Sequence, residues 1–251
     1  MKSDKKKIVI LVPTLRFGGG ERVAVKLINW FFAGSLKKKV VLYDKKIDYD
    51  LAKGVNVHTI NEKTDLQAGL TRSLSLIQKI IKIRKLLHCL KIKNILTIMP
   101  SMNVIGLLAA PKGSCVYITL HNIFRTNMGF LQKNIYNWFI NVLYPRAKAI
   151  IAVSEGVKKS YLDVNKRLNI EVVYNPIDLK KIHDMSTVKF VPPFKGSYIL
   201  GVGRLHKQKG FDLLLKAFSK MNRKDLRLVI LGDGSKKNEL IKLSKYLDVD
   251  T

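Results

Sequence analysis

The chain has 251 residues, of which 47% are hydrophobic and 25% charged. This composition is typical of a folded globular protein and argues against a disordered or fibrous chain. The 46 Lys and Arg residues outnumber the 18 Asp and Glu residues, so the formal net charge is +28. Such a charge favours anionic partners, namely phosphates, nucleic acid or acidic lipid headgroups. A compositional bias toward Lys is the alternative explanation.

The sequence carries no signal for secretion or for crossing a membrane. The apolar run Ile8–Val12, which follows Lys5–Lys7, is too short for a signal peptide. No stretch approaches the roughly 20 apolar residues of a membrane span. Cys89 and Cys115 lack metal-ligand spacing and are expected to be buried thiols in a reducing compartment. We therefore expect a cytoplasmic protein, either in solution or attached peripherally to the cytoplasmic face of the membrane.

Strand-like and helix-like runs alternate along the first two thirds of the chain, which predicts an α/β fold with a parallel sheet. The predicted strands are short apolar runs at Ile8–Val12, Val40–Tyr43, Val55–Thr59, Ile95–Ile98, Cys115–Leu120, Ala149–Val153 and Val172–Tyr174. The predicted helices lie at Glu21–Phe32, Leu70–Leu90, Asn103–Ala110, Leu131–Val142 and Gly156–Leu162.

The helix at 70–90 has an apolar face that can be interpreted in two ways. Helical spacing places five residues on it: Ile77, Ile80, Ile81, Leu87 and Leu90. Packing into the core is the first interpretation. The second places this basic helix, which also carries Lys79, Lys82 and Lys85, on an acidic lipid surface.

A second strand–helix unit begins near Tyr198. Pro176, Pro192, Pro193 and Gly196 precede it in a stretch with little periodicity, which is typical of a linker. We therefore predict a Rossmann-like domain over 1–180, a linker over 181–197 and an incomplete Rossmann-like domain over 198–251. Two strands and two helices cannot close a doubly wound sheet.

The segment from Tyr198 to Gly210 has the residues expected of a phosphate-binding loop. An apolar strand ends in Gly201 and Gly203, Arg204 follows at once, and Lys209-Gly210 opens an amphipathic run. Glycines let the backbone approach a ligand, and the start of a helix offers unpaired N–H groups to an anion. Together with two fixed positive charges, these features predict a site for a phosphate or a diphosphate.

This segment resembles the GR…KG motif of the retaining group-1 (family four) glycosyltransferases, which have the GT-B fold. Five more segments follow the order of that class: Gly18–Arg22, Ile118–Asn122, Ile150–Ser154, Val172–Asp178 and Leu228–Gly234. The resemblance implies that Arg204 and Lys209 neutralise the diphosphate of a nucleotide-sugar donor as it leaves. It also implies that His121 touches the transferred sugar or orients the acceptor.

The resemblance assigns further residues to two binding roles. Gly18, Gly19, Gly20 and Gly232 are expected beside the donor diphosphate, and Arg22, Asn122 and Arg125 beside the acceptor. For the glycines, ordinary tight turns are the alternative interpretation. Ser154 is most simply the cap of the following helix. The aromatic residues Phe124 and Phe130 are expected in an acceptor-facing loop.

Other cofactor-dependent classes have weaker support in the sequence. No G-x-G-x-x-G motif follows either strand, which argues against a nicotinamide enzyme. Two Asp-x-Asp matches exist, Asp48–Asp50 and Asp248–Asp250, and both are interpreted as chance, so neither a metal nor a cofactor is expected. The charge alone suggests nucleic acid, but the aromatic-basic motifs of nucleic-acid-binding modules are missing, so no nucleic-acid partner is expected.

The leading hypothesis is a hexosyltransferase that uses a nucleotide-diphosphate sugar and acts with retention. The expected acceptor is a surface glycan or a lipid-linked saccharide, with peripheral contact to an acidic membrane. The class also carries a Glu-x7-Glu element that is expected beyond residue 251, so the donor half is expected to be incomplete. The alternative is a non-catalytic fragment that acts as a binding or partner module.

Overall fold

The computed structural model describes residues 8–249, except for 17, 34–37, 45–46, 62–70, 125–128, 222 and 224. The chain divides into two compact units, Met1–Asp178 and Leu179–Thr251. They are called the first and the second unit below, and each is described by itself. The division lies close to the start of the predicted linker.

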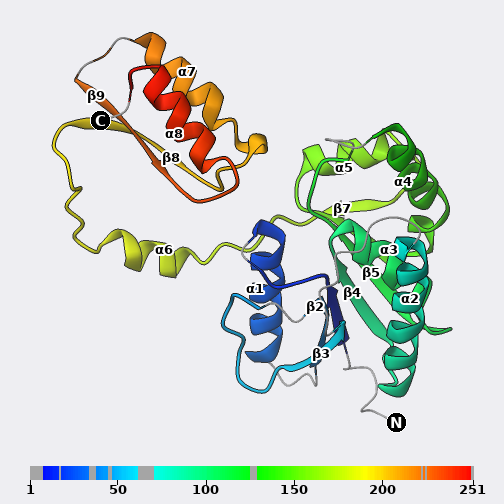
Figure 1. Ribbon diagram of the computed structural model, residues 1–251. Helices are drawn as coiled ribbons and strands as arrows, with labels where there is room; N and C mark the ends of the chain where they lie inside the picture. The colour runs from blue at the N-terminus through cyan, green and yellow to red at the C-terminus, as the bar shows by residue number, and fades with distance from the viewer. Residues whose placement is uncertain are drawn as a thin grey trace. The chain divides into compact units, whose positions relative to one another are not determined.

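A parallel seven-stranded sheet forms the centre of the first unit (Figure 1), in the order β3-β2-β1-β4-β5-β6-β7. Its strands are β1 Ile8–Val12, β2 Lys38–Asp44, β3 Asn56–Asn61, β4 Asn94–Ile98, β5 Cys115–Leu120, β6 Ala149–Ala152 and β7 Ile170–Val172. The central strands are continuous runs of apolar residues because parallel sheets are covered on both faces. The predicted α/β fold class is confirmed.

Helices cover both faces of this sheet. They are α1 Gly19–Ala33, α2 Thr71–Cys89, α3 Pro100–Ala109, α4 Phe130–Val142, a 3₁₀ turn η2 Tyr144–Arg146, and α5 Glu155–Leu162. Ile10, Val12 and Ile98 pack with α1 on one face. Val9, Leu11 and Ile118 belong to the larger core on the other face, to which α2, α3, α4 and α5 contribute. The strand order places helices on both faces. From β1 the sheet extends in one direction to β2 and β3 and in the other direction to β4–β7, and right-handed crossovers in opposite directions place their helices on opposite faces.

Three predictions for the first unit need correction. The last strand is Ile170–Val172 rather than Val172–Tyr174, since its partner β6 ends at Ala152. Ile77 and Ile81 of α2 are exposed, while Leu87 is buried in the core beside Ile83, so the predicted apolar face is split between solvent and core. Cys89 is exposed rather than buried.

The second unit contains a two-stranded parallel sheet with helices on one face. Its elements are α6 Leu179–Ser186, β8 Ser197–Val202, a 3₁₀ turn η3 Lys207–Lys209, α7 Phe211–Met221, β9 Leu226–Leu231 and α8 Lys237–Tyr246. The predicted linker at 181–197 therefore contains most of a helix, α6, that the proline-rich composition concealed. An open groove between the helices and the sheet is lined by Phe218, Leu228, Ile241 and their neighbours.

Alternation along β8 explains which face of this small sheet the helices cover. Gly201 faces Phe211 and Leu214 of α7. Tyr198, Leu200 and Val202 point the other way and are exposed. One side of the two-stranded sheet is therefore an exposed apolar face.

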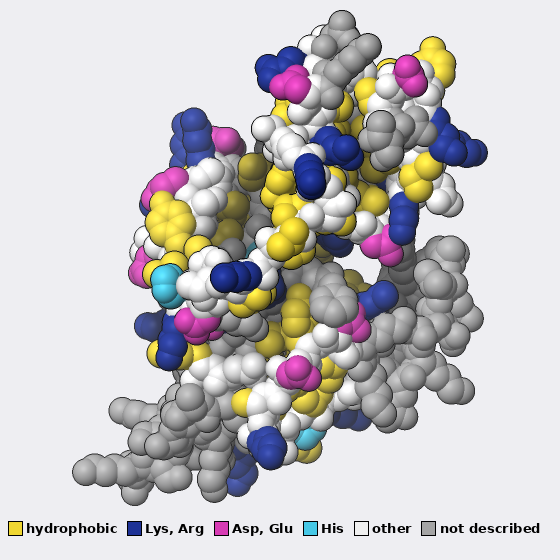
Figure 2. Space-filling view, turned by 90° about the vertical axis from the view of Figure 1, so that its left-hand side faces the viewer, with side chains coloured by type: hydrophobic (Ala, Val, Ile, Leu, Met, Phe, Trp, Pro, Cys, Tyr) yellow, Lys and Arg dark blue, Asp and Glu magenta, His cyan; other side chains and the backbone are white. Residues whose placement is uncertain are grey.

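Figure 2 shows Lys and Arg scattered over the visible face, with exposed hydrophobic side chains between them. Within the described part of the chain, no helix is both long enough and apolar enough to span a bilayer.

Candidate functional site

The carboxyl edge of the sheet in the first unit gathers most of the residues singled out in the sequence. Strands β1, β4, β5 and β6 are neighbours and run parallel, so the segments that follow them lie along one edge. Those segments carry Gly18–Gly20, Met99, His121 and Ser154. Ligands of open α/β sheets bind at this edge. The structure thus places Gly18–Gly20 and His121, which are predicted site residues of the first unit, along a common edge.

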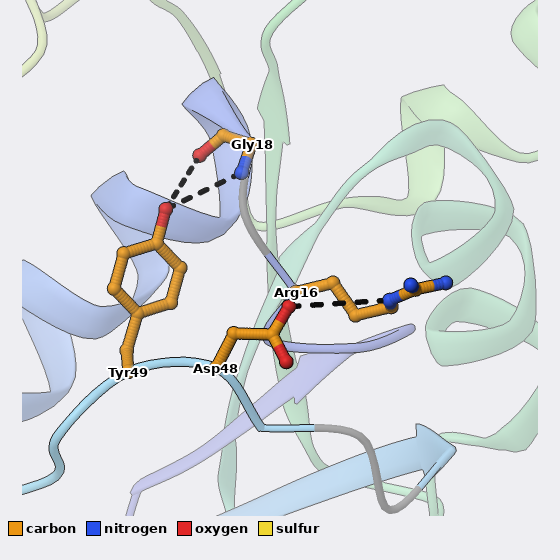
Figure 3. A network of polar contacts seen from close by, with 4 residues as sticks. All are labelled: Arg16, Gly18, Asp48 and Tyr49. Atoms are coloured by element: carbon orange, nitrogen blue, oxygen red, sulfur yellow. Dashed lines mark hydrogen bonds and ion pairs between the residues drawn. The ribbon is translucent and has the colours of Figure 1, made fainter. Parts of the chain in front are cut away.

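The glycine loop after β1 is held by a tyrosine that sequence reasoning missed (Figure 3). The hydroxyl of Tyr49 donates to the carbonyl oxygen of Gly18 and accepts from the Gly18 N–H, both at 3.3 Å. The carbonyl oxygen of Gly18 also accepts the first helical bond of α1, from the Arg22 N–H at 2.9 Å. A Cβ atom at Gly18 would overlap the carboxylate of Glu21. The loop is therefore closely packed around Gly18.

The Asp-x-Asp match at 48–50 has a structural explanation. Asp48 pairs with Arg16 at 4.0 Å (Figure 3), and the backbone bridge between Leu15 and Ile47 lies next to this pair. The carbonyl oxygen of Asp50 accepts from the side-chain amide of Asn29 on α1 at 3.3 Å. These contacts fasten the 47–52 loop to α1 at Asn29, and the loop carries Tyr49 to Gly18.

Met99 is a second residue that the sequence did not indicate. It ends β4 with φ 84° and ψ 145°, a conformation that is strained for any residue with a side chain. A Cβ atom at Gly20 would lie 3.1 Å from the Met99 sulfur atom, so the glycine loop and Met99 are in close contact. Strained backbone of this kind concentrates at functional sites. Only the backbone geometry reveals Met99 as a candidate site residue.

His121 is fixed by a closed ring of buried hydrogen bonds. Its Nε2 atom lies 2.9 Å from the hydroxyl of Thr119, which donates to the carbonyl oxygen of Thr97 at 2.8 Å. The Thr97 hydroxyl donates to the Asn103 side-chain oxygen at 2.7 Å. The Asn103 amide donates to the carbonyl oxygen of Thr119 at 3.0 Å and closes the ring. Thr97, Asn103 and Thr119 are buried.

This ring also determines the tautomer of His121. The only hydroxyl hydrogen of Thr119 is used toward Thr97, so the Thr119 oxygen must accept from the His121 Nε2–H. Nδ1 of the neutral imidazole then keeps its lone pair. Burial lowers the pKa of His121 from its ordinary value of 6.5, which favours this neutral form. The imidazole can therefore accept a hydrogen bond from a sugar hydroxyl.

The loop after His121 departs in one respect from its predicted role. Asn122 is exposed, as an acceptor-binding residue requires. Phe124 is instead buried against Tyr161, and its N–H donates to the Ser160 hydroxyl on α5 at 3.1 Å. The expectation that Phe124 faces an acceptor is therefore wrong, because the core takes its ring. Arg125 lies outside the described residues.

In the second unit, the predicted phosphate loop has the expected local form. β8 leads through Gly203 and Arg204 into η3, and Gly210 then adopts a left-handed conformation with φ 67° directly before α7. The Lys209 side chain folds back over Gly203, since a Cβ atom at Gly203 would lie 3.7 Å from the Lys209 Cδ and Cε atoms. Arg204 and Lys209 are exposed. The structure thus places the Lys209 side chain beside the residue that precedes Arg204.

Gly232 has a structural role that the sequence could not distinguish from phosphate binding. A Cβ atom there would overlap the carbonyl oxygen of Gly203, and one at Gly234 would overlap backbone atoms of Leu205. The 203–205 and 232–234 segments are also joined by a bond from the Leu205 N–H to the Asp233 carbonyl oxygen at 2.9 Å. Contact between the two loops therefore explains these glycines. The binding role assigned to Gly232 stays a prediction.

Three further residues can be located in the structure directly. The Ser154 hydroxyl accepts from the Val157 N–H at 3.3 Å, so Ser154 caps α5 as expected. His206 is exposed, and its Nδ1 accepts from the Gln208 N–H at 3.5 Å. Arg22 is exposed on the first turn of α1.

Each unit contains a strand, a glycine loop and a helix in succession, the arrangement with which Rossmann-like folds bind nucleotides. Comparison with protein families agrees with this. The family model described as Glycosyltransferase Family 4 matches residues 17–181, and the one described as Glycosyl transferases group 1 matches residues 186–250. The chain therefore belongs to the group-1, family 4 glycosyltransferases.

Similar proteins with assigned functions come from Campylobacter jejuni. One is N-acetylgalactosamine-N,N'-diacetylbacillosaminyl-diphospho-undecaprenol 4-alpha-N-acetylgalactosaminyltransferase, which is 29% identical over 97% of this chain and 67% of its own length. Another is an alpha-1,4-N-acetyl-D-galactosaminyltransferase that is named for a diNAcBac-PP-undecaprenol substrate. It is 25% identical over 93% of this chain and 63% of its own length. The chain thus spans about two thirds of the length of these relatives.

A solved structure shows the same fold at low sequence identity. Anabaena Alr3699/HepE, in complex with UDP and glucose, has a TM-score of 0.71 and 17% identity, covering 98% of this chain and 67% of that one. This likeness supports the predicted GT-B fold.

Proposed function

We propose that the protein transfers a hexosyl residue from a nucleotide-diphosphate sugar to a lipid-linked saccharide or surface glycan, with retention. The observation that carries this proposal is the loop from Gly203 to Gly210. It places Arg204, Lys209 and the start of α7 together in a chain of the glycosyltransferase family. The Campylobacter relatives are named for undecaprenol-diphosphate-linked substrates, and the Anabaena structure contains UDP.

The chemistry requires stabilisation of a leaving diphosphate. The bond between the anomeric carbon and the β-phosphate oxygen breaks, the acceptor oxygen bonds to the anomeric carbon, and the proton of the acceptor hydroxyl passes to the leaving diphosphate, on which negative charge develops. Arg204 and Lys209 stabilise that negative charge, and the N–H groups at the start of α7 contribute further stabilisation. No cofactor or metal is part of this proposal, because the two side-chain cations supply the positive charge.

The first unit supplies the acceptor side in this proposal. His121, neutral and fixed by Thr119, accepts a hydrogen bond from a sugar hydroxyl through Nδ1. Arg22, Asn122 and Arg125 contact the acceptor, and Gly18–Gly20 approach the donor diphosphate. The acceptor's lipid places the protein at the cytoplasmic face of an acidic membrane.

Calorimetric titration with UDP, GDP and ADP tests the donor site. Wild type is expected to bind at least one of them. The double variant Arg204→Met/Lys209→Met should weaken that binding by at least tenfold, because it removes two charge-assisted contacts. Lys207→Met, in the same loop, is the matched control and should bind like wild type. Equal affinity in wild type and double variant would reject the proposed diphosphate site.

The alternative of a non-catalytic binding or partner module has one observation in its favour. Tyr198, Leu200 and Val202 present an exposed apolar face that another polypeptide could cover. A transfer assay with radiolabelled nucleotide sugars and undecaprenol-linked saccharides separates the two. Labelled lipid that forms with wild type and disappears with Arg204→Met/Lys209→Met supports the enzyme and removes the alternative.

A further inference from the structure

Helix α4 exposes apolar residues along the side that faces away from the core. Leu131, Ile135, Trp138 and Val142 follow one another at helical spacing and share one face. Their side chains are 74%, 49%, 56% and 47% exposed, respectively. The opposite side of the helix packs Tyr136, Phe139 and Ile140 into the core. These four exposed residues are called the α4 apolar stripe below.

Such a stripe differs from the isolated exposed apolar residues found on most proteins. A contiguous apolar surface that includes Trp usually marks an interaction site. Phe130, at the first position of α4, is 80% exposed and enlarges the apolar surface at that end. Tryptophan favours the boundary between lipid headgroups and acyl chains, where its ring is buried and its N–H stays in a polar layer.

In the sequence around α4, every charged residue is positive. From residue 66 to residue 154 the sequence contains twelve Lys and Arg residues and no Asp or Glu. This stretch includes α2, α3 and α4, which contribute to the same core on one face of the sheet. Lys82 and Lys85 of α2 are exposed, and Ile77 and Ile81 of that helix are exposed as well. This stretch therefore combines exposed apolar side chains with a positive charge that no acidic residue within it offsets.

Charge complementarity decides what this face can bind. A second copy of the chain would bring the same positive charge against it, which opposes self-association through α4. An anionic bilayer satisfies both features, because its headgroups attract the Lys and Arg side chains and its interface accepts the apolar stripe. We propose that the protein docks on anionic phospholipid through the α4 apolar stripe, with the lysines of α2 supporting the contact.

This surface extends the membrane role proposed above, and its relation to the acceptor site rests on that proposed function. α4 follows the loop that begins at His121, so Phe130 and Leu131 lie at the end of α4 nearest the carboxyl edge of the sheet. Docking through the stripe therefore brings the candidate acceptor site close to the lipid headgroups. Binding to lipid needs neither donor nor acceptor, so its failure would leave the nucleotide-binding test unaffected.

The two tryptophans of the chain provide an internal control for this proposal. Trp138 belongs to the stripe, while Trp30 lies on α1, which covers the opposite face of the sheet, and is 71% exposed. Trp30→Phe leaves Trp138 as the only reporter, and Trp138→Phe leaves Trp30. Each full-length variant is mixed with vesicles of equimolar phosphatidylglycerol and phosphatidylcholine, some with brominated acyl chains.

We expect a blue shift and quenching by brominated lipid for Trp138 alone. Pure phosphatidylcholine vesicles should produce neither effect. A response from Trp30 that equals or exceeds that of Trp138 would overturn the proposal. So would the lack of any Trp138 response on anionic vesicles, or an equal Trp138 response on neutral ones.

Vesicle sedimentation then separates the apolar contribution from the electrostatic one. Ile135→Gln/Val142→Gln should weaken binding at least tenfold, whereas Leu213→Gln, at a more exposed leucine on α7, should not change it. Lys82→Gln/Lys85→Gln should weaken binding on the order of twentyfold, since each surface lysine contributes a factor of about five. Far-UV circular dichroism checks that each variant is folded. Wild-type binding by both double variants would contradict the proposal.

Discussion

The two glycine loops of this protein are built in different ways. Side chains hold the loop at Gly18–Gly20. The Tyr49 hydroxyl bonds to both the N–H and the carbonyl oxygen of Gly18, and the Met99 sulfur atom lies against Gly20. The loop at Gly203–Gly210 is held by backbone, because the 232–234 segment lies so close that a Cβ atom at Gly232 has no room. Similar sequence patterns thus conceal different physical constraints. Side chains around the first loop can move to admit a substitution, whereas the backbone that lies against Gly232 cannot.

The largest expected effect is on the second loop. Gly232→Ala forces apart two backbone segments and should destabilise the second unit by about 3 kcal/mol or more. Both tryptophans lie in the first unit, so tryptophan fluorescence reports on that unit, while far-UV circular dichroism reports on both. Urea titration should show an early transition by dichroism that fluorescence does not share.

A control variant in the same pair of loops sharpens this test. Gly203→Ala meets Phe211 only at an ordinary contact distance of 3.6 Å, so its stability should stay close to that of wild type. If Gly232→Ala and Gly203→Ala unfold at the same urea concentration, the backbone contact at Gly232 does not limit substitution there.

The second largest effect is expected in the hydrogen-bonded ring below His121. Asn103→Ala removes the amide that donates to the buried Thr119 carbonyl oxygen and leaves the Thr97 hydroxyl only its longer bond to the Tyr117 carbonyl oxygen, at 3.4 Å, at a cost of about 2–3 kcal/mol. The fluorescence transition in urea should therefore move to lower denaturant. Asn141→Ala, on the exposed side of α4, removes a similar amide and should have little effect. An unchanged transition for Asn103→Ala would contradict the proposed ring.

A smaller effect is expected from the pH dependence of His121. Its folded-state pKa is lowered by burial, so below pH 6.5 the unfolded chain takes up a proton that the folded protein resists. This histidine therefore lowers stability as the pH falls through 6.5 toward its folded-state pKa and has no such effect above 6.5. In urea titrations at several pH values, His121→Gln should lose stability less steeply than wild type on the acid side. If the stability of both proteins falls equally steeply with pH, the result would contradict a His121 pKa that is lowered by burial.

The smallest effect is expected at the first loop. Tyr49→Phe removes a hydroxyl whose two hydrogen bonds to Gly18 are long, at 3.3 Å each, so about 0.5–1 kcal/mol of stability should be lost. Urea titration followed by fluorescence measures this loss, and Tyr174→Phe, an exposed tyrosine of the first unit, is the control. A loss as large as that of Gly232→Ala would remove the contrast between the two loops.

The sequence by itself determined the α/β class, most element positions and the family resemblance. β1 and β5 have the predicted bounds, and α7 begins directly after Gly210 as the sequence indicates, because an apolar run and a helical period that follows a glycine are local signals. The Arg204 and Lys209 loop could be predicted for the same reason, since its glycines, charges and helix start are contiguous in the chain.

Only the tertiary structure decided the features that depend on contacts between distant residues. The proline-rich stretch concealed α6, pairing with β6 ended β7 at Val172, and core packing took Phe124 away from the acceptor loop. The contact of Gly232 with Gly203, the bracing of Gly18 by Tyr49 and the exposure of Trp138 have no local signature. Each depends on which segments the sheet order brings side by side, and a one-dimensional pattern does not contain that information.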